Sequence, residues 1–290
     1  MRKEALFYEK LEDQKVHCLL CPWDCVIANG KNGVCGVRRN EDGILYSLIY
    51  GIVSSLALDP IEKKPVYHFQ PRTHVMSAGT FGCNMFCGHC QNWRISQERK
   101  NFEGNYISPE KFIEVALAEN AQGVAWTYNE PTIWFEYTLD CAKLAKENNL
   151  YTVYVTNGYI NIPPLEMIAP YLDVYRVDIK AYHPETYKKL CKINYPEKVF
   201  EAAVHAKNQL KMHVEVITNV VPTLNDSDEE LTGIARFIHD KLGEDVPWHV
   251  TRFFPCLDFR HLSPTPIETL EKAKKIGLDC GLKYVHIGNV

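Results

Sequence analysis

Hydrophobic positions along most of the chain follow two periodicities in turn. Short apolar runs rich in β-branched and aromatic residues are followed by longer stretches in which apolar residues recur every three or four positions. The first pattern is typical of buried strands and the second of amphipathic helices. The pattern predicts strands at 75–80, 124–128, 151–156, 174–179, 213–221, 249–254 and 284–287, and helices at 108–118, 132–148, 197–209, 228–241 and 267–280.

A strand and a helix in regular alternation predict parallel βα units with right-handed crossovers. Such units build either a doubly wound sheet or a barrel. No G-x-G-x-x-G sequence follows the first strand, so a dinucleotide site has no support. Residues 1–74 lack the alternation, and we expect them to form a small N-terminal extension, with short strands, packed on a domain of residues 75–290.

Composition and charge exclude several function classes. The 290 residues are 46% hydrophobic and 23% charged, with a formal net charge of −4. This balance rules out disorder and disfavours binding to a nucleic-acid backbone. No run approaches the roughly 18 apolar residues that a membrane span needs, and the first ten residues lack a secretory signal. We therefore expect a cytoplasmic protein without a membrane role.

Eleven cysteines are the unusual feature, and seven of them form two clusters. An expected reducing compartment and an odd count argue against disulfides. Cys83, Cys87 and Cys90 follow the first predicted strand with C-x3-C-x2-C spacing. Three thiolates can hold three corners of a [4Fe–4S] cluster and leave one iron open. The second group of thiols consists of Cys18, Cys21, Cys25 and Cys35. Four thiols suit either a structural zinc or an auxiliary [4Fe–4S] cluster.

The three-cysteine motif resembles the signature of the radical SAM superfamily, with His89 at the position where the family has an aromatic residue. The resemblance implies a partial (β/α)6 TIM-like barrel within an α/β fold and a cluster on Cys83, Cys87 and Cys90. It also implies that S-adenosylmethionine (SAM) chelates the open iron. Reductive cleavage of SAM would then give a 5′-deoxyadenosyl radical that abstracts a hydrogen atom.

Other strand ends match the family less closely. Asn129 and Glu130 stand where the family often has Gly-Gly-Glu, so the resemblance assigns them to the methionyl amine of SAM. Two further segments resemble the parts of glycyl-radical-activating enzymes that contact the ribose and the carboxylate of SAM. Their residues here are Thr156, Asn157, Asp178 and Lys180. We also expect Arg252 to point into the mouth of the barrel toward cofactor or substrate, with a salt bridge to a neighbouring strand as the alternative.

Nearly the whole chain resembles the AmmeMemoRadiSam system radical SAM enzymes, which are relatives of pyruvate formate-lyase-activating enzymes. The resemblance rests on 59–65, 90–93, 127–131, 155–158 and 288–290 together with the cysteines. Members continue with another cysteine pair after Gly-Asn-Val, so this chain is either a short member or a trimmed fragment.

The leading functional hypothesis is a radical SAM enzyme that activates or modifies a protein, with a reductant such as ferredoxin or flavodoxin. Radical modification of a small molecule or a tRNA is the second hypothesis. A metal-binding scaffold without catalysis is the third.

Overall fold

The computed structural model describes residues 2–290, and an eight-stranded sheet runs through most of the molecule. Its strand order is β16-β15-β14-β13-β12-β11-β9-β8. All neighbouring strands in it pair in parallel except β8 and β9, which pair antiparallel. The strands are β8 (Ser55–Pro60), β9 (His74–Gly79), β11 (Gly123–Trp126), β12 (Tyr151–Thr156), β13 (Val174–Asp178), β14 (His213–Val220), β15 (Trp248–Arg252) and β16 (Val285–Gly288).

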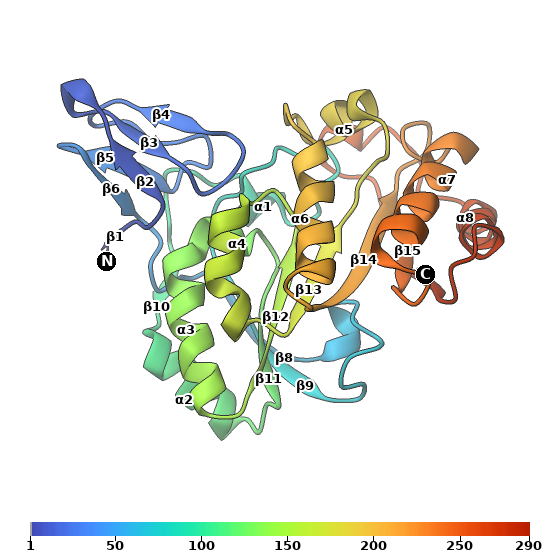
Figure 1. Ribbon diagram of the computed structural model, residues 1–290, viewed down its shortest axis with the longest axis horizontal. Coiled ribbons are helices and arrows are strands. Elements are labelled where there is room, and N and C mark those ends of the chain that lie inside the picture. Colours follow the sequence, from blue (N-terminus) through green and yellow to red (C-terminus); the bar gives the residue numbers. More distant parts are fainter. Residues whose placement is uncertain (1) are drawn as a thin grey trace.

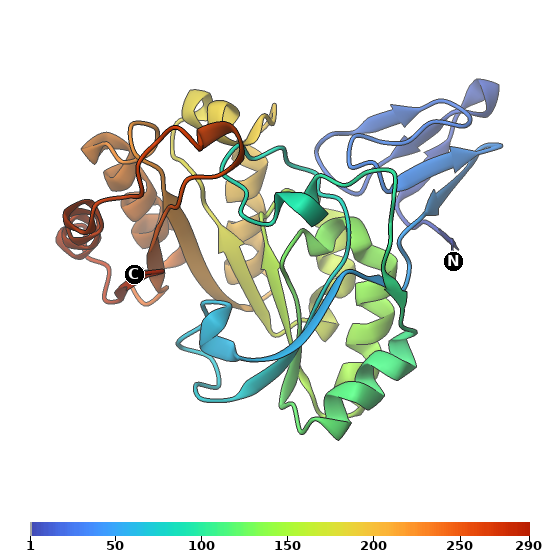
Figure 2. The ribbon, with the colours of Figure 1, turned by 180° about the vertical axis from the view of Figure 1, so that it is seen from behind.

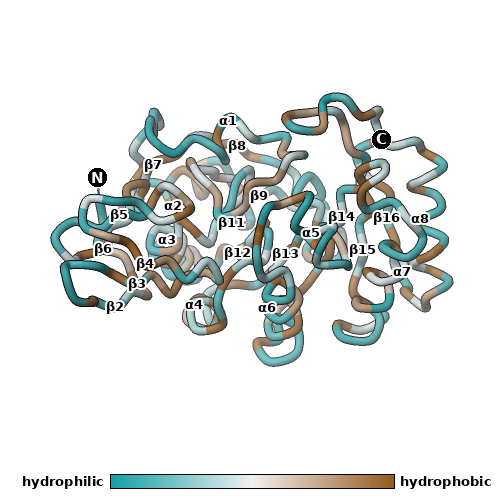
Figure 3. Tube along the Cα trace, turned by 90° about the horizontal axis from the view of Figure 1, so that it is seen from above, coloured by the Kyte–Doolittle hydropathy of each residue, from teal (hydrophilic) through white to brown (hydrophobic). Residues whose placement is uncertain are grey.

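Helices cover one face of this sheet, and the β8–β9 hairpin lies across the other face (Figure 1, Figure 2). Figure 3 shows β11, β12 and β13 between α3, α4 and α6 on one side and β8 and β9 on the other. The helices are α1 (Trp93–Ser96), α2 (Pro109–Ala118), α3 (Phe135–Glu147), α4 (Ile162–Ile168), α5 (Pro184–Cys191), α6 (Glu197–Asn208), α7 (Asp228–Phe237) and α8 (Ile267–Asp279). The architecture is the α/β partial barrel expected from the resemblance, and no helix among residues 2–290 is long and apolar enough to cross a membrane.

Most predicted elements lie within a few residues of the observed ones, but three short helices were missed. In α4, two prolines follow the first residue, and they interrupt the apolar periodicity that would reveal a helix. Proline is compatible with the first turn because the N–H groups there have no partner within the helix. The missed α5 is eight residues long, and α1 has four, so neither gives a clear period.

The N-terminal segment forms two small three-stranded antiparallel sheets. One has the order β1-β6-β5 and the other β2-β3-β4, and a separate pair joins β7 to β10. These strands are β1 (Lys3–Glu4), β2 (Tyr8–Lys10), β3 (Val16–Cys18), β4 (Cys25–Ile27), β5 (Arg38–Glu41), β6 (Ile44–Ser47), β7 (Ile52–Val53) and β10 (Asn105–Tyr106). Because β8 already belongs to the main sheet, the expected boundary at residue 74 falls inside the β8–β9 hairpin.

The sheet separates two hydrophobic cores. The larger core packs the helices and the N-terminal sheets against the outer face. The smaller core fills the inside of the open barrel, where residues Ile61 and Val66 of the β8–β9 connection meet inward side chains of four strands. Those four side chains, which the alternation of a strand places on one face, are Val75, Ala125, Val153 and Val174.

The buried carboxylate of Glu215 on β14 anchors this connection across the barrel. It accepts the backbone N–H of Tyr67 at 3.0 Å and of His68 at 2.8 Å. Its oxygens also contact Nε2 of His213 at 2.9 Å and of His249 at 2.6 Å. Burial alone would raise the pKa of Glu215, but these hydrogen bonds outweigh it and hold the pKa well below its usual value.

A second histidine pair joins the connection to the last strand. Nε2 of His68 lies 2.8 Å from Nε2 of His286 on β16, and the ring of His249 stacks on that of His286 with centroids 5.1 Å apart. Burial, together with the neighbouring charges of His249 and His68, lowers the pKa of His286 to about 4. His286 is therefore neutral in the folded protein near pH 7.

Acidification should destabilise the protein between the ordinary histidine pKa of 6.5 and about 4. In this window the unfolded chain binds a proton at residue 286 that the folded chain does not bind. The contribution of His286 is thus present above pH 6.5 and is lost as the pH falls through the window. Denaturant unfolding from pH 7.5 to pH 4.5 measures it, and His286→Gln should flatten part of the decline.

The control is His205→Gln, because His205 pairs with Glu166 on the surface at 3.0 Å, away from the connection. This variant should keep the slope of the natural chain. A His286→Gln variant with an unchanged slope would contradict the account.

Candidate active site

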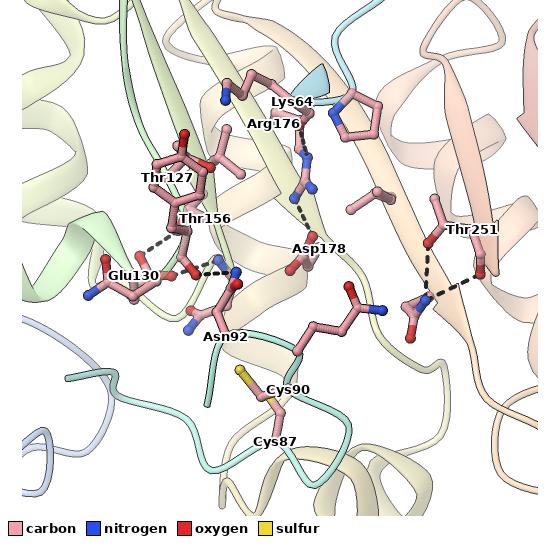
Figure 4. A pocket seen from close by; sticks show the side chains of 18 of the residues that line it. Lys64, Cys87, Cys90, Asn92, Thr127, Glu130, Thr156, Arg176, Asp178 and Thr251 are labelled. Atoms are coloured by element: carbon pink, nitrogen blue, oxygen red, sulfur yellow. Dashed lines mark hydrogen bonds and ion pairs between the residues drawn. The ribbon is translucent and has the colours of Figure 1, made fainter. Parts of the chain in front are cut away.

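A cavity of about 500 Å³ lies at the carboxyl ends of the strands, on the inner face of the sheet. Figure 4 shows Cys87 and Cys90 on one side of it, Lys64 and Arg176 on the opposite side, and Asp178 between them. The structure brings ten of the expected residues to its wall, namely Cys83, Cys87, His89, Cys90, Asn129, Glu130, Thr156, Asn157, Asp178 and Lys180.

The loop that carries the three cysteines follows β9 and is held by asparagines. Asn129 accepts the N–H of Thr80 at 3.0 Å and donates to the carbonyl of Gly82 at 2.9 Å. Asn84 donates to Tyr159 O at 2.7 Å and accepts from Nδ2 of Asn157 at 2.9 Å. Both amide ends of Asn129 therefore position the cysteine loop, although the resemblance assigned this residue to the cofactor.

Each of the three thiols has a different environment. Nδ2 of Asn157 lies 3.5 Å from Sγ of Cys83, and burial raises the pKa of this thiol. Sγ of Cys90 lies 3.1 Å from the hydroxyl of Ser96, and burial raises its pKa as well. Cys87 hydrogen-bonds Cys191 at the end of α5, and this contact lowers the pKa of Cys87.

Glu130 fixes the ends of β11 and β12 relative to each other. The residue is 1% exposed, and Oε1 accepts from Thr132 N at 2.9 Å and from the hydroxyl of Thr156 at 2.7 Å. Oε2 accepts from Asn157 N at 2.8 Å. Three protein donors thus orient the carboxylate at the cavity wall, and burial raises its pKa.

A row of charges on β13 and just beyond it faces the cavity. Arg176, Asp178 and Lys180 are two residues apart, so they point to the same side of the sheet. Asp178 forms ion pairs with Arg176 and, at 2.7 Å, with Nζ of Lys180. Burial would raise the pKa of Asp178, but the two cations outweigh it and keep the pKa below its usual value.

His89 is held by packing alone. Its ring is 6% exposed and stacks on Phe259 with centroids 6.5 Å apart. Nδ1 has no hydrogen-bond partner among residues 2–290. Burial, together with the nearby charge of Lys180, lowers the pKa of His89 to about 3, so the ring is neutral at pH 7.

The structure places Arg252 away from both of its expected positions. Thr251 lines the cavity, so its neighbour Arg252 on β15 points to the other side of the strand. Nε of Arg252 donates to Thr265 O at 2.9 Å, and the guanidinium lies over the ring of Phe254. Among residues 2–290 it forms no salt bridge and does not line the cavity.

Sequence reasoning missed Arg176, Lys64 and Cys191. Arg176 lies two residues before Asp178, so strand alternation would have placed it on the same face. Lys64 reaches the cavity from the β8–β9 connection, where Nζ pairs with Asp59 at 2.6 Å and its carbonyl accepts Nε of Arg176 at 2.7 Å. Cys191 lies at the end of the missed helix α5, and no local signal places it beside Cys87.

The four N-terminal cysteines lie together at one end of the small sheets. Cys18 and Cys25 are direct partners on β3 and β4, with Cys21 between them in sequence. Burial raises the pKa of Cys21, and the charges of Cys18, Cys35 and Cys25 raise it further, so the four thiols are within electrostatic reach of one another. All eleven cysteines of the chain are free.

The fold and the site together define a class of protein, an α/β partial-barrel enzyme with a three-cysteine loop at the carboxyl ends of its strands. The model of the radical SAM superfamily matches residues 78–238, which is more than half of the chain. The chain belongs to the radical SAM superfamily.

Individual relatives agree with this assignment. The chain is 45% identical over 289 residues to an uncharacterised protein of Methanocaldococcus jannaschii, with 99% of this chain and 85% of the relative covered. It is 25% identical over 219 residues to the pyruvate formate-lyase-activating enzyme of Clostridium pasteurianum, covering 70% and 87%. A radical SAM methyltransferase structure from Sphaerobacter thermophilus shares the fold with a TM-score of 0.59, at 16% identity, covering 77% and 68%. The protein is thus a radical SAM enzyme related to pyruvate formate-lyase-activating enzymes.

Membership in the superfamily implies a [4Fe–4S] cluster and SAM, and the donors at the cavity fit them. Three thiols from one loop line the cavity, and no other cysteine of residues 2–290 does so. Cys83, Cys87 and Cys90 would hold the cluster, and the polar wall beside them offers acceptors and donors to a zwitterionic ligand. When bound, the two groups supply radical chemistry.

Asn129→Asp should loosen the cysteine loop. The new carboxylate still accepts the N–H of Thr80. The amide group that donated to the carbonyl of Gly82 is lost, and a negatively charged oxygen faces that carbonyl instead. The expected local cost is about 1–3 kcal/mol, which corresponds to amide exchange in the loop that is about fivefold faster or more. Hydrogen exchange on the metal-free protein measures this.

Asn194→Asp is the matched control, because Asn194 is an exposed residue after α5. Its loop exchange should equal that of the natural chain. The same rates in Asn129→Asp would show that Asn129 does not position the loop.

Proposed function

We propose that the protein cleaves SAM reductively at a cluster on Cys83, Cys87 and Cys90 and uses the radical to abstract hydrogen from a protein substrate. The observation that carries the first part is the convergence of three cysteines, without a fourth among the described residues, on one cavity. An iron without a protein ligand is then open to the amine and carboxylate of SAM.

The cavity wall supports this assignment of roles. Glu130 is a buried acceptor beside the cysteine loop, and we assign it to the methionyl amine. Lys180, beside Cys87, is the cation that we assign to the methionyl carboxylate. Asp178 already pairs with Lys180, so this carboxylate and that of SAM would share the same ammonium group. Thr156 and Asn157 supply polar atoms for the ribose.

Two observations favour a protein substrate. The relative from Clostridium pasteurianum is named as an activating enzyme of another enzyme, and so is a second, from Klebsiella oxytoca. The ring of Trp93, next to the cavity residue Asn92, is 40% exposed, and Phe254 beyond the end of β15 is 39% exposed. Exposed aromatic side chains at a rim are typical anchors of protein–protein contacts.

Reduced thiols and a reducible cluster both require a reducing compartment, so we place the protein in the cytosol. A one-electron donor such as ferredoxin or flavodoxin would reduce the cluster there.

Anaerobic reconstitution, reduction by dithionite and incubation with SAM should yield 5′-deoxyadenosine. Cys83→Ala should lose this activity by at least a hundredfold, because two thiols cannot hold the cluster in place. Cys280→Ala, at the end of α8 and outside the cavity, is the control and should keep the activity. Equal product from the natural chain and Cys83→Ala would contradict the proposal.

The substrate class can be tested with fractions of an anaerobic extract from the native host. The macromolecular fraction should stimulate 5′-deoxyadenosine formation, and protease treatment should abolish the stimulation. Trp93→Ala should reduce the stimulation severalfold and leave the basal cleavage unchanged, since its ring does not line the cavity. Stimulation by the small-molecule fraction, or its loss after nuclease treatment, would instead indicate a small-molecule or RNA substrate.

A further inference from the structure

The four N-terminal cysteines form a compact donor set outside the active cavity. Cys18, Cys21 and Cys35 are 7%, 9% and 9% exposed. Cys25 Sγ faces Gly33, where an added Cβ would lie 3.8 Å from the sulfur. Four thiols shielded in this way, without disulfides, are a typical ligand set for a metal centre.

A buried arginine points at this donor set. Arg38 is 1% exposed, and its Nη1 donates to Sγ of Cys18 at 3.3 Å. Its other end pairs with Glu136 of α3, and Nε has no partner among residues 2–290. The guanidinium would offset part of the negative charge that four thiolate ligands bring to a metal centre.

The arrangement of the sulfurs bears on the kind of metal. A single zinc at 2.3 Å from each of four sulfurs would draw them to within about 3.8 Å of one another. The ligands of a [4Fe–4S] cluster bind four different irons and therefore stand farther apart. Four thiolates suit either centre, and a position next to the cysteine loop of the active cavity favours the redox-active one.

This donor set touches the cysteine loop of the active cavity at three places. Gly82, which precedes Cys83, has a φ of +84°, and a Cβ there would lie 3.1 Å from the carbonyl of Cys35. Arg99 donates to Val34 O and, at 3.2 Å, to Cys83 O. The indole of Trp23, between Cys21 and Cys25 in sequence, donates to Asn84 O at 2.5 Å.

We propose that Cys18, Cys21, Cys25 and Cys35 hold a redox-active [4Fe–4S] cluster that passes single electrons to the cluster on Cys83, Cys87 and Cys90. This proposal rests on the proposed function, because its electron acceptor is the cluster that we assign there to the cysteine loop of the active cavity. Two contacts connect the donor set with the cysteine loop along this path, namely the approach of the Cys35 carbonyl to Gly82 and the side chain of Arg99, which bridges Val34 O and Cys83 O. The N-terminal cluster is oxidised from the 1+ to the 2+ state while its acceptor is reduced from 2+ to 1+. An external one-electron donor, of the ferredoxin or flavodoxin class, then reduces the N-terminal cluster again.

Metal content and electron paramagnetic resonance of the full chain test whether the N-terminal cysteines hold a [4Fe–4S] cluster. After anaerobic reconstitution the natural chain should hold about eight irons, and both Cys18→Ser/Cys25→Ser and Cys83→Ser/Cys87→Ser/Cys90→Ser should hold about four. The signal of the fully reduced natural chain should be broader than the sum of the two variants' signals, because adjacent paramagnetic clusters interact. One zinc per chain as isolated, with no iron lost in Cys18→Ser/Cys25→Ser, would overturn the inference.

Reduction kinetics test whether the N-terminal cluster passes electrons to the cluster of the active cavity. With reduced flavodoxin as donor, Cys18→Ser/Cys25→Ser should reduce its remaining cluster at least tenfold more slowly than the natural chain. Dithionite, a small reductant that needs no docking, should still reduce it fully, and addition of SAM should still change its signal. An unchanged rate with flavodoxin would overturn the relay.

Arg99→Ala keeps all the cysteines and guards against a variant that fails to fold. It should retain about eight irons but slow reduction by flavodoxin severalfold, whereas Arg236→Ala on α7 should change neither quantity. Equal rates for the two arginine variants would count against the path. If the N-terminal cluster is present but SAM changes no signal in any variant, the proposed function fails while the second metal site stands.

Discussion

The carboxylate of Glu215 holds the two sides of the open sheet together. It lies on β14, and the N–H groups it accepts belong to the connection between β8 and β9, at the other edge of the sheet. A carboxylate taken out of water needs such donors, and two histidines supply the rest. The connection thereby becomes the floor of the cavity, to which it contributes Lys64 and Tyr67. The geometry of the active cavity thus depends on one buried charge far from the cysteines in sequence.

The alternation of strand residues explains which predictions from the sequence succeeded. The spacing of the three cysteines and the apolar runs located the loop and the strands to within a few residues. Strand phase then decides which side chain enters the cavity, and it places Arg176 inside and Arg252 outside. For β13 this phase was available from the sequence, because Arg176 and Asp178 are two residues apart.

Other parts of the site depend on contacts that no local pattern encodes. The hydrogen bond between Arg176 and Lys64 joins residues 112 positions apart, and that between Tyr67 and Glu215 joins residues 148 positions apart. The pairing of Cys87 with Cys191 and the contact of Gly82 with Cys35 also arise only when the barrel and the N-terminal sheets have packed. These contacts bring the two separate cysteine motifs next to each other, which neither motif reveals by itself.

The central claim is that three cysteines leave one iron open to SAM. Electron–nuclear double resonance on the reduced protein tests it most directly, with SAM that carries ¹⁵N in its amine and ¹⁷O in its carboxylate. The account predicts hyperfine coupling of both nuclei to the cluster on Cys83, Cys87 and Cys90, measured in the variant that lacks Cys18 and Cys25. A reduced cluster without coupling to either nucleus, at SAM concentrations that saturate binding, would contradict it.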